Sequence, residues 1–407
     1  MPHTARNNNT SIGVAITGMG IISAIGNNVQ ENLDALMASE HGISKISHIT
    51  TRHKAEIKVG EIALSNVQLS EKLQLPKDHA YSRTAMLGCL AAKEAVENAG
   101  IVDIENGNTG LISATSVGGM DLTEAFIKEY AIHPETQKYI KSHQAADSTE
   151  RIADMLGING FVTTISTACS SGANAIMMGA RMIKAGKLDR VIVGGTDSLS
   201  KFTINGFKTL LILSDTNCTP FDANRKGLNL GEAAAYLVLE SDAVVQRTNK
   251  KVLAYVSGYG NANDAFHQTA SSENGDGAYL AMIKALQIAK LQTPQIDYIN
   301  AHGTATPNND LAESIAIKRV FTQNVPKFSS TKAFTGHTLA AAGAIEAVYS
   351  ILALQENMIF PNLNFSNAIP ETLLEPQGTI LKKEINHVLS NSFGFGGNCT
   401  TLVFSKK

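Results

Sequence analysis

The residues best suited to chemistry form a short run around Cys169, Thr164-Ile165-Ser166-Thr167-Ala168-Cys169-Ser170-Ser171-Gly172. A β-branched stretch ends before this cysteine, and a small-residue stretch typical of a helix opens after it. A strand-to-helix turn places its residue at a helix N-terminus, where unpaired N–H groups and the helix dipole favour a thiolate. The run therefore predicts a nucleophile elbow built on sulfur. The alternative is a buried, inert cysteine, and this segment alone does not decide between the two.

Two histidines lie in similar turns further along the chain. His302 follows an expected strand in Asn300-Ala301-His302-Gly303-Thr304, and His337 ends the run Ser330-Thr331-Lys332-Ala333-Phe334-Thr335-Gly336-His337. A single histidine is more often a packed or solvated residue, but two in such turns favour a shared catalytic site. A third turn, residues 391–398, is glycine-rich without the spacing of a phosphate loop. It suits a place where backbone approaches a ligand closely.

Short apolar strands alternate with longer helical patterns along the chain, which is typical of an α/β fold with buried strands. We expect strands at Gly13–Thr17, Gly110–Ala114, Thr163–Ser166, Arg190–Gly194, Ala235–Glu240, Val252–Tyr255, Tyr298–Asn300, Lys327–Ser330, Val388–Asn391 and Thr401–Phe404. We expect helices at Tyr81–Asn98, Gly172–Lys184, Tyr279–Ala289, Asp310–Val320 and Ala340–Gln355. Long loops are expected at 52–77 and 201–231, as caps or docking surfaces.

The first five strands and the last five form two similar series. Each series opens with a strand running into a glycine-containing turn, Thr17-Gly18-Met19-Gly20 in one and Ser257-Gly258-Tyr259-Gly260 in the other. Each also places a Ser/Thr-rich strand before a functional turn. The element order therefore predicts a duplicated α/β unit with a boundary near Asp242–Lys251.

Composition narrows the class of protein. The 407 residues are 43% hydrophobic and 17% charged with a formal net charge of −2, which gives no reason to expect nucleic acid or an anionic membrane as partner. The four cysteines share no paired spacing, as expected for free thiols in a reducing compartment. The polar N-terminus does not read as a signal peptide, and no apolar run approaches the ~20 residues that span a bilayer. We expect a soluble, cytoplasmic protein with a flexible tail over residues 1–11.

Taken together, these motifs resemble an elongating β-ketoacyl-acyl carrier protein synthase, a member of the thiolase-fold condensing enzymes. The resemblance runs from the Gly13–Gly20 segment to the final strand. It rests on the Cys169 elbow, the His302 turn, the turn holding Lys332 and His337, and the glycine-rich turn. It implies two duplicated βαβαβαββ halves in a five-layered αβαβα architecture. Residues 12–245 would carry the nucleophile and residues 246–407 the two histidines.

The resemblance also implies how the turns would work together. Cys169 would accept an acyl chain, with the oxyanion between the backbone N–H groups of Cys169 and Phe395 and with Phe393 as a gating neighbour. His302 and His337, as neutral imidazoles, would bind the malonyl thioester carbonyl and stabilise the enolate left by departing carbon dioxide. That carbanion would attack the acyl-Cys carbonyl. No metal or organic cofactor is expected, because loss of the carboxylate drives the step and acyl chains arrive on the phosphopantetheine of acyl carrier protein.

Charged residues near these turns would support the site. Lys332 resembles the family's active-site lysine, and because an unpaired buried lysine is costly, we expect it to pair with Glu313, one helical face below Asp310. Glu346 matches another acid that anchors the site. Asp310 and Glu313 after His302 also resemble a metal set, but an available lysine and the absence of a second nearby ligating histidine disfavour a metal.

Three further residues match substrate-binding positions of the family. Thr304 and Thr306 match hydroxyls that hydrogen-bond a phosphopantetheine arm, and turn capping by the same residues would be compatible with that role. Val117 matches a position at the far end of the acyl tunnel, where its modest size would admit a long chain. Departures from the usual pattern favour a specialised acyl group, such as a polyene, over ordinary fatty-acid elongation; they are Lys226, Leu228, Asn229, Ala234 and Cys399.

The expected partners are acyl carrier protein and a second ketosynthase chain, in a homodimer or in a heterodimer with a sister subunit. Because acyl carrier proteins are acidic, a docking surface should be basic, although scattered solvated side chains would look the same in the sequence. The candidates are Arg52, Lys54, Lys58, Lys201, Lys208, Arg225 and Lys226. An alternative is a non-catalytic chain-length subunit, which would lack the nucleophile that Cys169 supplies. A degradative thiolase is disfavoured, because Cys399 is followed by Thr400-Thr401 instead of a Cys-x-Gly pattern.

Overall fold

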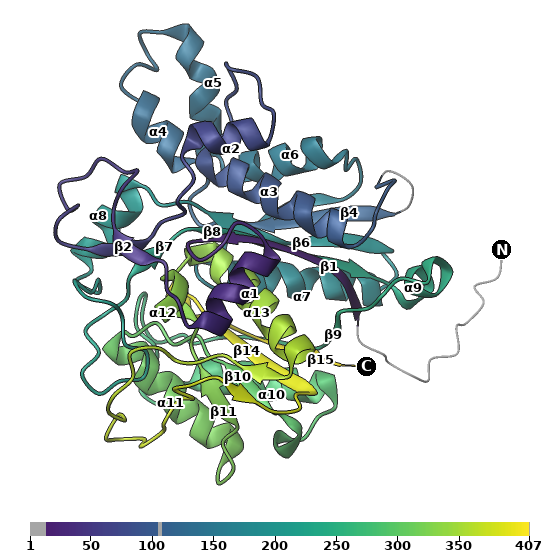
Figure 1. Ribbon diagram of the computed structural model, residues 1–407, viewed down its shortest axis with the longest axis vertical. Coiled ribbons are helices and arrows are strands. Elements are labelled where there is room, and N and C mark those ends of the chain that lie inside the picture. Colours follow the sequence, from purple (N-terminus) through teal and green to yellow (C-terminus); the bar gives the residue numbers. More distant parts are fainter. Residues whose placement is uncertain (1–13, 105–107, 407) are drawn as a thin grey trace.

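The computed structural model describes residues 14–104 and 108–406, so the expected tail over residues 1–11 lies outside the described residues. Its main element is a ten-stranded sheet in the order β11-β10-β14-β15-β9-β1-β8-β6-β4-β5 (Figure 1). The strands are β1 (Val14–Ser23), β4 (Thr109–Ala114), β5 (Val162–Ile165), β6 (Arg190–Asp197), β8 (Ala233–Glu240), β9 (Ala254–Asn263), β10 (Tyr298–Asn300), β11 (Lys327–Ser329), β14 (His387–Phe393) and β15 (Asn398–Ser405). All ten strands expected from the sequence are present in this sheet.

The strand order reads alike from both edges, which confirms the duplication. In each half three parallel strands (β5, β4 and β6, or β11, β10 and β14) are followed by two antiparallel ones. The halves meet where β1 pairs with β9 over Val14–Ile16 and Ala254–Val256. The predicted division at residue 245 falls inside the short helix α9 (Asp242–Thr248), which connects β8 to β9, and it stays a prediction.

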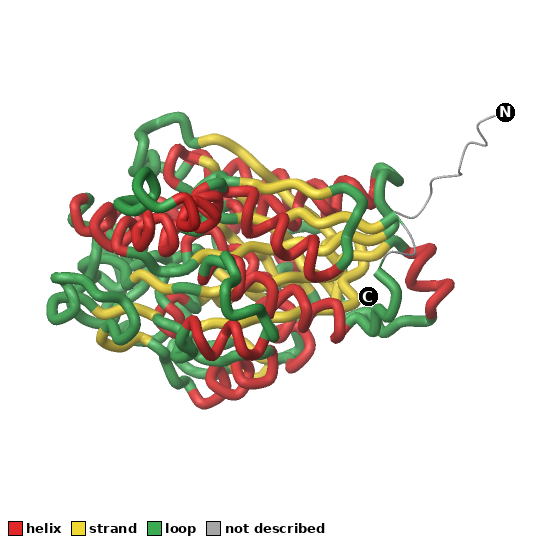
Figure 2. The backbone as a smooth tube through the Cα atoms, turned by 90° about the horizontal axis from the view of Figure 1, so that it is seen from above, coloured by secondary structure: helices red, strands yellow, loops and turns green. Residues whose placement is uncertain are grey.

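Helices cover both halves of the sheet and fill the space between them. The helices are α1 (Val29–Ala38), α2 (Asn66–Lys72), α3 (Arg83–Asn98), α4 (Met120–Phe126), α5 (Gln137–Ile140), α6 (Ala145–Leu156), α7 (Ser171–Lys184), α8 (Lys201–Thr209), α9, α10 (Asp276–Ala289), α11 (Pro307–Phe321), α12 (Lys332–Thr335) and α13 (Ala342–Glu356). Helices α3 and α6 pack on the first half of the sheet and α10 on the second, beside α11, whereas α7 and α13 contact each other and both halves. Figure 2 shows the strands with helices packed around them. This arrangement is the five-layered α/β architecture that the family resemblance implies.

Glycines that looked like turns lie inside strands. Gly20 of β1 packs on α3, where an added Cβ would lie 2.2 Å from Ala91 O, and Gly260 of β9 packs on α10, where it would lie 2.1 Å from Ala281 O. Close approach of a helix backbone, and not a turn, therefore explains these glycines. The expectation that each strand ends at its glycines was wrong, since both strands are ten residues long and continue past them, β1 to Ser23 and β9 to Asn263.

The two expected long loops also contain regular structure. The first contains β3 (Lys58–Gly60) and α2, and the second contains α8 and β7 (Leu230–Gly231). Strand β3 lies between β2 (Ile43–Lys45) and β7 in a small sheet, and β12 (Met358–Ile359) pairs with β13 (Leu381–Lys382). Among the described residues, one helical stretch, Leu339–Glu356, is long and apolar enough to cross a membrane. Because 89% of this stretch is buried inside the protein, it is a core helix.

Candidate active site

Cys169 lies in the sharp turn between β5 and α7, as the sequence predicts. Ala168 adopts a left-handed φ of 52°, and α7 begins at Ser171. The Ser171 hydroxyl accepts from Thr167 N at 2.8 Å and donates to Ala168 O at 2.5 Å, so a side chain of the helix start holds the turn closed. Cys169 is buried, with 5% of its surface exposed, and it faces a cavity.

Burial controls the protonation of this thiol. It raises the pKa of Cys169 to about 11, although the Lys332 charge and a hydrogen bond from Phe395 N–H to the sulfur both act in the lowering direction. Burial therefore opposes the thiolate that the turn was expected to favour. The free-energy cost of desolvating the thiolate is larger than the stabilisation that its neighbours provide.

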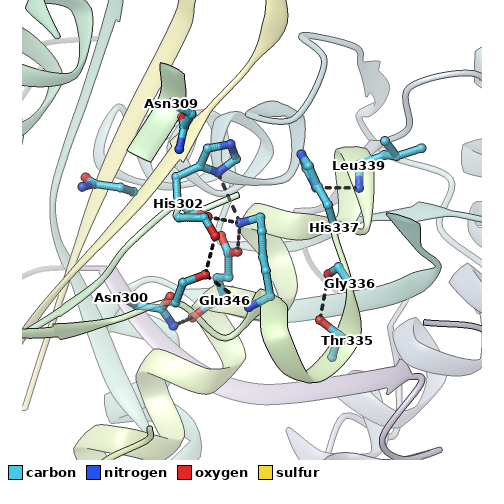
Figure 3. Close-up of polar contacts among 12 residues, drawn as sticks. Asn300, His302, Asn309, Thr335, Gly336, His337, Leu339 and Glu346 are labelled. Atoms are coloured by element: carbon cyan, nitrogen blue, oxygen red, sulfur yellow. Dashed lines mark hydrogen bonds and ion pairs between the residues drawn. The ribbon is translucent and has the colours of Figure 1, made fainter. Parts of the chain in front are cut away.

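His302 and His337 face each other beside the same cavity. Their ring centroids lie 5.4 Å apart at an interplanar angle of 86°. His337 Nδ1 accepts from Leu339 N at 3.2 Å, and His302 Nδ1 lies 3.3 Å from Lys332 Nζ, which only donates (Figure 3). In both rings the proton is therefore on Nε2. Burial, followed by the Lys332 charge, lowers the pKa of each histidine well below its usual value, which agrees with the neutral imidazoles expected.

Lys332 pairs with a different carboxylate from the one the sequence suggested. Its Nζ, in a side chain 3% exposed, forms an ion pair with Glu346 and also donates to His302 O at 2.5 Å. The expected pairing with Glu313 was wrong. Glu346 reaches Lys332 from the first turns of α13, directly behind the histidine turns.

Glu313 and Asp310 hold the His302 turn by its backbone. Glu313 accepts from the backbone N–H groups of His302 and Gly303 at 2.9 and 2.8 Å, and from Asn391 Nδ2 at 3.0 Å. Asp310 accepts from Ala305 N at 3.1 Å and from Phe221 N at 2.7 Å. The backbone donors of His302, Gly303 and Ala305 lie in the turn between β10 and α11. They occupy both carboxylates, which is why neither acid pairs with the lysine. Burial raises the pKa of Glu313 to about 7.

The glycine-rich turn closes one side of the site. Gly394 lies against the elbow, where an added Cβ would come within 2.7 Å of Thr167 O and 3.2 Å of Cys169 N. This contact brings the Phe395 N–H to the sulfur of Cys169. The Phe393 ring lies 5.6 Å from the His302 ring. The Phe395 ring stacks on Phe207 of α8, with centroids 5.9 Å apart.

A cavity of about 350 Å³ joins these turns. Cys169, His302, His337, Thr304 and Thr306 line it together with Phe393 and Phe395. Lys332, Glu313, Glu346 and Asp310 lie behind the lining and support it. Val117 is not among the lining residues, so its place in an acyl tunnel stays a prediction. The Thr304 and Thr306 hydroxyls lie 2.9 Å apart, at the start of α11.

The structure adds cavity residues that the sequence analysis did not single out. Phe207, Leu210, Leu211 and Ile212 form an apolar side of the cavity, and His267 to Ser271 form another part of its rim. The first group belongs to α8 and its continuation, inside the stretch expected to cap a site. Leu211 is 86% exposed and has a left-handed φ of 58°. No sequence pattern predicts the exposure or the backbone conformation of Leu211.

Several of the basic docking candidates already have partners within the chain. Arg225 donates to Pro307 O at 2.6 Å and Thr306 O at 3.3 Å, so it braces the rim of the cavity. Lys208 forms a 3.1 Å ion pair with Glu56, and Lys58 donates to Asn217 Oδ1 at 3.0 Å. Arg52, Lys54, Lys201 and Lys226 are exposed.

Comparison with known proteins agrees with the fold and the site. The chain matches the model of the β-ketoacyl synthase N-terminal domain over residues 12–244 and that of the C-terminal domain over residues 253–366. It is 33% identical to 3-oxoacyl-[acyl-carrier-protein] synthase 2 of Staphylococcus aureus (strain MRSA252) and 35% identical to a putative mitochondrial 3-oxoacyl-[acyl-carrier-protein] synthase of Schizosaccharomyces pombe. Each match covers 97% of this chain and 99% of the relative.

Among solved structures, the ishigamide ketosynthase/chain length factor superposes with a TM-score of 0.91 at 29% identity, over 97% of this chain and 99% of the other. A fold with two thiolase-like halves and a site with one cysteine and two histidines define a condensing enzyme. The chain belongs to the β-ketoacyl synthase family. It is an elongating β-ketoacyl-acyl carrier protein synthase, an acyltransferase that forms carbon–carbon bonds in fatty acid or polyketide chain elongation.

Proposed function

We propose that this chain is the catalytic ketosynthase of its assembly and that it uses Cys169, His302 and His337 in two successive half-reactions. The observation that carries the proposal is the single cavity onto which the buried thiol and both neutral imidazoles face. A non-catalytic chain-length subunit would have no use for this set of residues. The ishigamide neighbour is named as a ketosynthase/chain length factor, and we propose a similar pairing of this chain with a second ketosynthase-fold chain.

The first half-reaction transfers an acyl group to sulfur. The Cys169 thiol loses its proton and attacks the thioester carbonyl, and a carbon–sulfur bond forms while the carbonyl oxygen becomes an oxyanion. The backbone N–H groups of Cys169 and Phe395 stabilise that charge, and each such donor contributes roughly 3–4 kcal/mol in comparable sites. The tetrahedral intermediate then collapses, the carbon–sulfur bond to pantetheine breaks, and the leaving pantetheine thiolate takes up one proton in place of the one that Cys169 lost, so the exchange is balanced.

The second half-reaction forms the carbon–carbon bond. Nε2–H groups of His302 and His337 donate to the malonyl thioester oxygen, and the carbon–carbon bond to the carboxylate breaks to release carbon dioxide. The electron pair left behind is held as an enolate by these two donors. Its carbon attacks the acyl-Cys169 carbonyl, and the cysteine thiolate leaves and is reprotonated. Burial, assisted by the Lys332 charge, lowers the pKa of both imidazoles and keeps them neutral. The Lys332 ammonium also fixes the proton of His302 on Nε2.

We further propose that the acyl and malonyl groups arrive on acyl carrier protein in the cytoplasm and that no metal or organic cofactor takes part. The name of the Staphylococcus aureus relative includes acyl carrier protein as its substrate carrier. The Thr304 and Thr306 hydroxyls on the cavity lining would hydrogen-bond the phosphopantetheine arm. The departures from the family pattern, such as Cys399, favour a specialised acyl chain over an ordinary fatty acid.

The test is incubation with acyl-loaded carrier protein followed by intact-mass measurement. The wild-type chain should gain one acyl mass and Cys169→Ala none. Cys89→Ala provides the matched control, because Cys89 is a free, buried cysteine on α3, and it should acylate like the wild type. Normal acylation of Cys169→Ala would contradict the proposed mechanism.

A further inference from the structure

A hydrogen-bond network beneath the cavity joins the two turns that hold the oxyanion donors. At its centre Asn398 Oδ1, at the start of β15, accepts from Ser170 Oγ at 2.8 Å, Asn174 Nδ2 at 2.8 Å and Asn261 Nδ2 at 2.9 Å. Ser170 follows the nucleophile, Asn174 lies on α7, and Asn261 lies on β9. One side-chain oxygen therefore ties the elbow, its helix and a strand of the other half of the fold together.

The surrounding groups complete the network. Asn174 donates from Nδ2 to Thr167 Oγ1 at 2.9 Å, and its Oδ1 accepts from Thr400 Oγ1 at 2.7 Å. Thr400 Oγ1 in turn accepts from Asn261 Nδ2 at 2.9 Å. Asn174 and Thr400 are 5% and 0% exposed. Because several hydrogen bonds join these largely buried groups, the network favours one arrangement of the backbone segments that it connects.

The main chain of Asn398 holds the other turn. Gly394 N donates to Asn398 O at 2.9 Å, which closes the glycine-rich turn that carries Phe395. The contact of Gly394 with Thr167 O and Cys169 N then presses this turn against the elbow. Asn398 is thus bonded to the elbow through its side chain and to the Phe395 turn through its backbone.

We propose that Asn398 is the positioning residue that sets the separation between the Cys169 and Phe395 N–H groups. The inference rests on the proposed function, in which these two groups bind the oxyanion. An oxyanion hole works because its donors are already aimed at the place where charge develops, and small misplacements are costly. Loss of the Asn398 oxygen removes the acceptor that three donors share. This side chain then no longer fixes the position of the elbow relative to the glycine-rich turn.

Two reactions of the Cys169 sulfur distinguish a misplaced oxyanion hole from general damage to the site. Acylation by an acyl-carrier thioester passes through an oxyanion, whereas alkylation by iodoacetamide displaces iodide at carbon and develops no oxyanion. Both reactions require the Cys169 thiolate. Asn398→Ala should slow acylation by tenfold or more relative to wild type and change the alkylation rate by less than threefold. Asn398→Asp, which keeps an acceptor for the three donors, should restore the wild-type ratio of the two rates.

Asn263→Ala is the matched control. Asn263 lies opposite Asn398 in the strand register, is exposed, and donates to Gly396 O at 3.2 Å on the outer side of the same turn. It should keep the wild-type ratio. If Asn398→Ala does not fold, Asn261→Ala, which removes one donor, replaces it and should lower the same ratio. Equal loss of both reactions, or no loss of acylation, would overturn the role of Asn398. Failure of the wild type to acylate would instead refute the proposed function.

Discussion

Replacement of Glu346 by glutamine tests what holds the centre of this site together. Glu346 and Lys332 are 1% and 2% exposed, and their ion pair is the contact that balances the lysine charge. Glu346→Gln preserves the size of the side chain and a carbonyl oxygen, but it removes the negative charge. The lysine then remains buried with neutral partners, chiefly His302 O at 2.5 Å.

The expected cost follows from this burial. Removal of one member of a buried pair strands the other charge and typically destabilises by about 3–5 kcal/mol, whereas neutral replacement of both members costs much less. We therefore expect Glu346→Gln to lower the free energy of unfolding by about 3–5 kcal/mol. The double variant Lys332→Met/Glu346→Gln should recover at least half of the loss. It should still condense poorly, because His302 Nδ1 loses the donor that fixes its proton on Nε2.

The assay is urea unfolding followed by far-ultraviolet circular dichroism. Glu97→Gln is the matched control, because Glu97 and Lys93 form a 3.9 Å ion pair on the exposed side of α3, with side chains 67% and 55% exposed. Its loss should change stability by less than about 0.5 kcal/mol. The reasoning is refuted if Glu346→Gln costs no more than Glu97→Gln, or if the double variant is less stable than Glu346→Gln.

Three further predictions concern packing and protonation. Gly260→Ala should destabilise the fold by roughly 1–3 kcal/mol, because its Cβ would collide with the Ala281 carbonyl on α10. Gly206→Ala on α8 is the control: its Cβ would meet nothing within 4 Å, so it should be neutral or stabilising. Urea unfolding of the two variants measures the difference. Decarboxylation of malonyl carrier by Cys169→Ala should not follow the titration of an ordinary histidine between pH 8 and pH 6, because burial and the Lys332 charge lower the pKa values of His302 and His337 and both remain neutral as the pH falls through 6.5. A decline centred near 6.5 in a stopped-flow carbon dioxide assay would contradict this. Alkylation of Cys169 by iodoacetamide should accelerate about tenfold per pH unit from pH 7 to 9, because its pKa is raised to about 11 and the thiolate fraction keeps growing. A rate that levels off as the pH approaches 9 would show an ordinary or lowered pKa.

The strands could be predicted because their cause is local. Each strand is a short apolar or β-branched run, because a strand that is buried on both faces needs apolar side chains at nearly every position. Their ends were less predictable. Gly18 and Gly20 carry a turn signal in the sequence, but the approach of α3 to the sheet requires glycine inside β1. Eight helices in the described part of the chain were not expected from the sequence, and two of them, α2 and α8, lie in stretches expected to be loops; the eight are α1, α2, α4, α5, α6, α8, α9 and α12.

In the site, the residue types were predictable and their partnerships were not. Cys169, His302 and His337 follow strands of both halves, so the topology brings them together. The choice of Glu346 over Glu313 for Lys332 depends on which carboxylate is already taken by backbone N–H groups of the His302 turn. The raised pKa of Cys169 depends on burial that no local pattern encodes.

The most direct test of the central claim is a chase experiment on pre-acylated protein. His337→Ala keeps the Cys169 elbow and both oxyanion N–H groups, so it should take up the acyl mass at close to the wild-type rate. On addition of malonyl carrier, the wild type should lose that mass and release a β-ketoacyl product, while His337→Ala should retain the acyl group. Release from His337→Ala at the wild-type rate would contradict the account, since condensation would then not need the second imidazole.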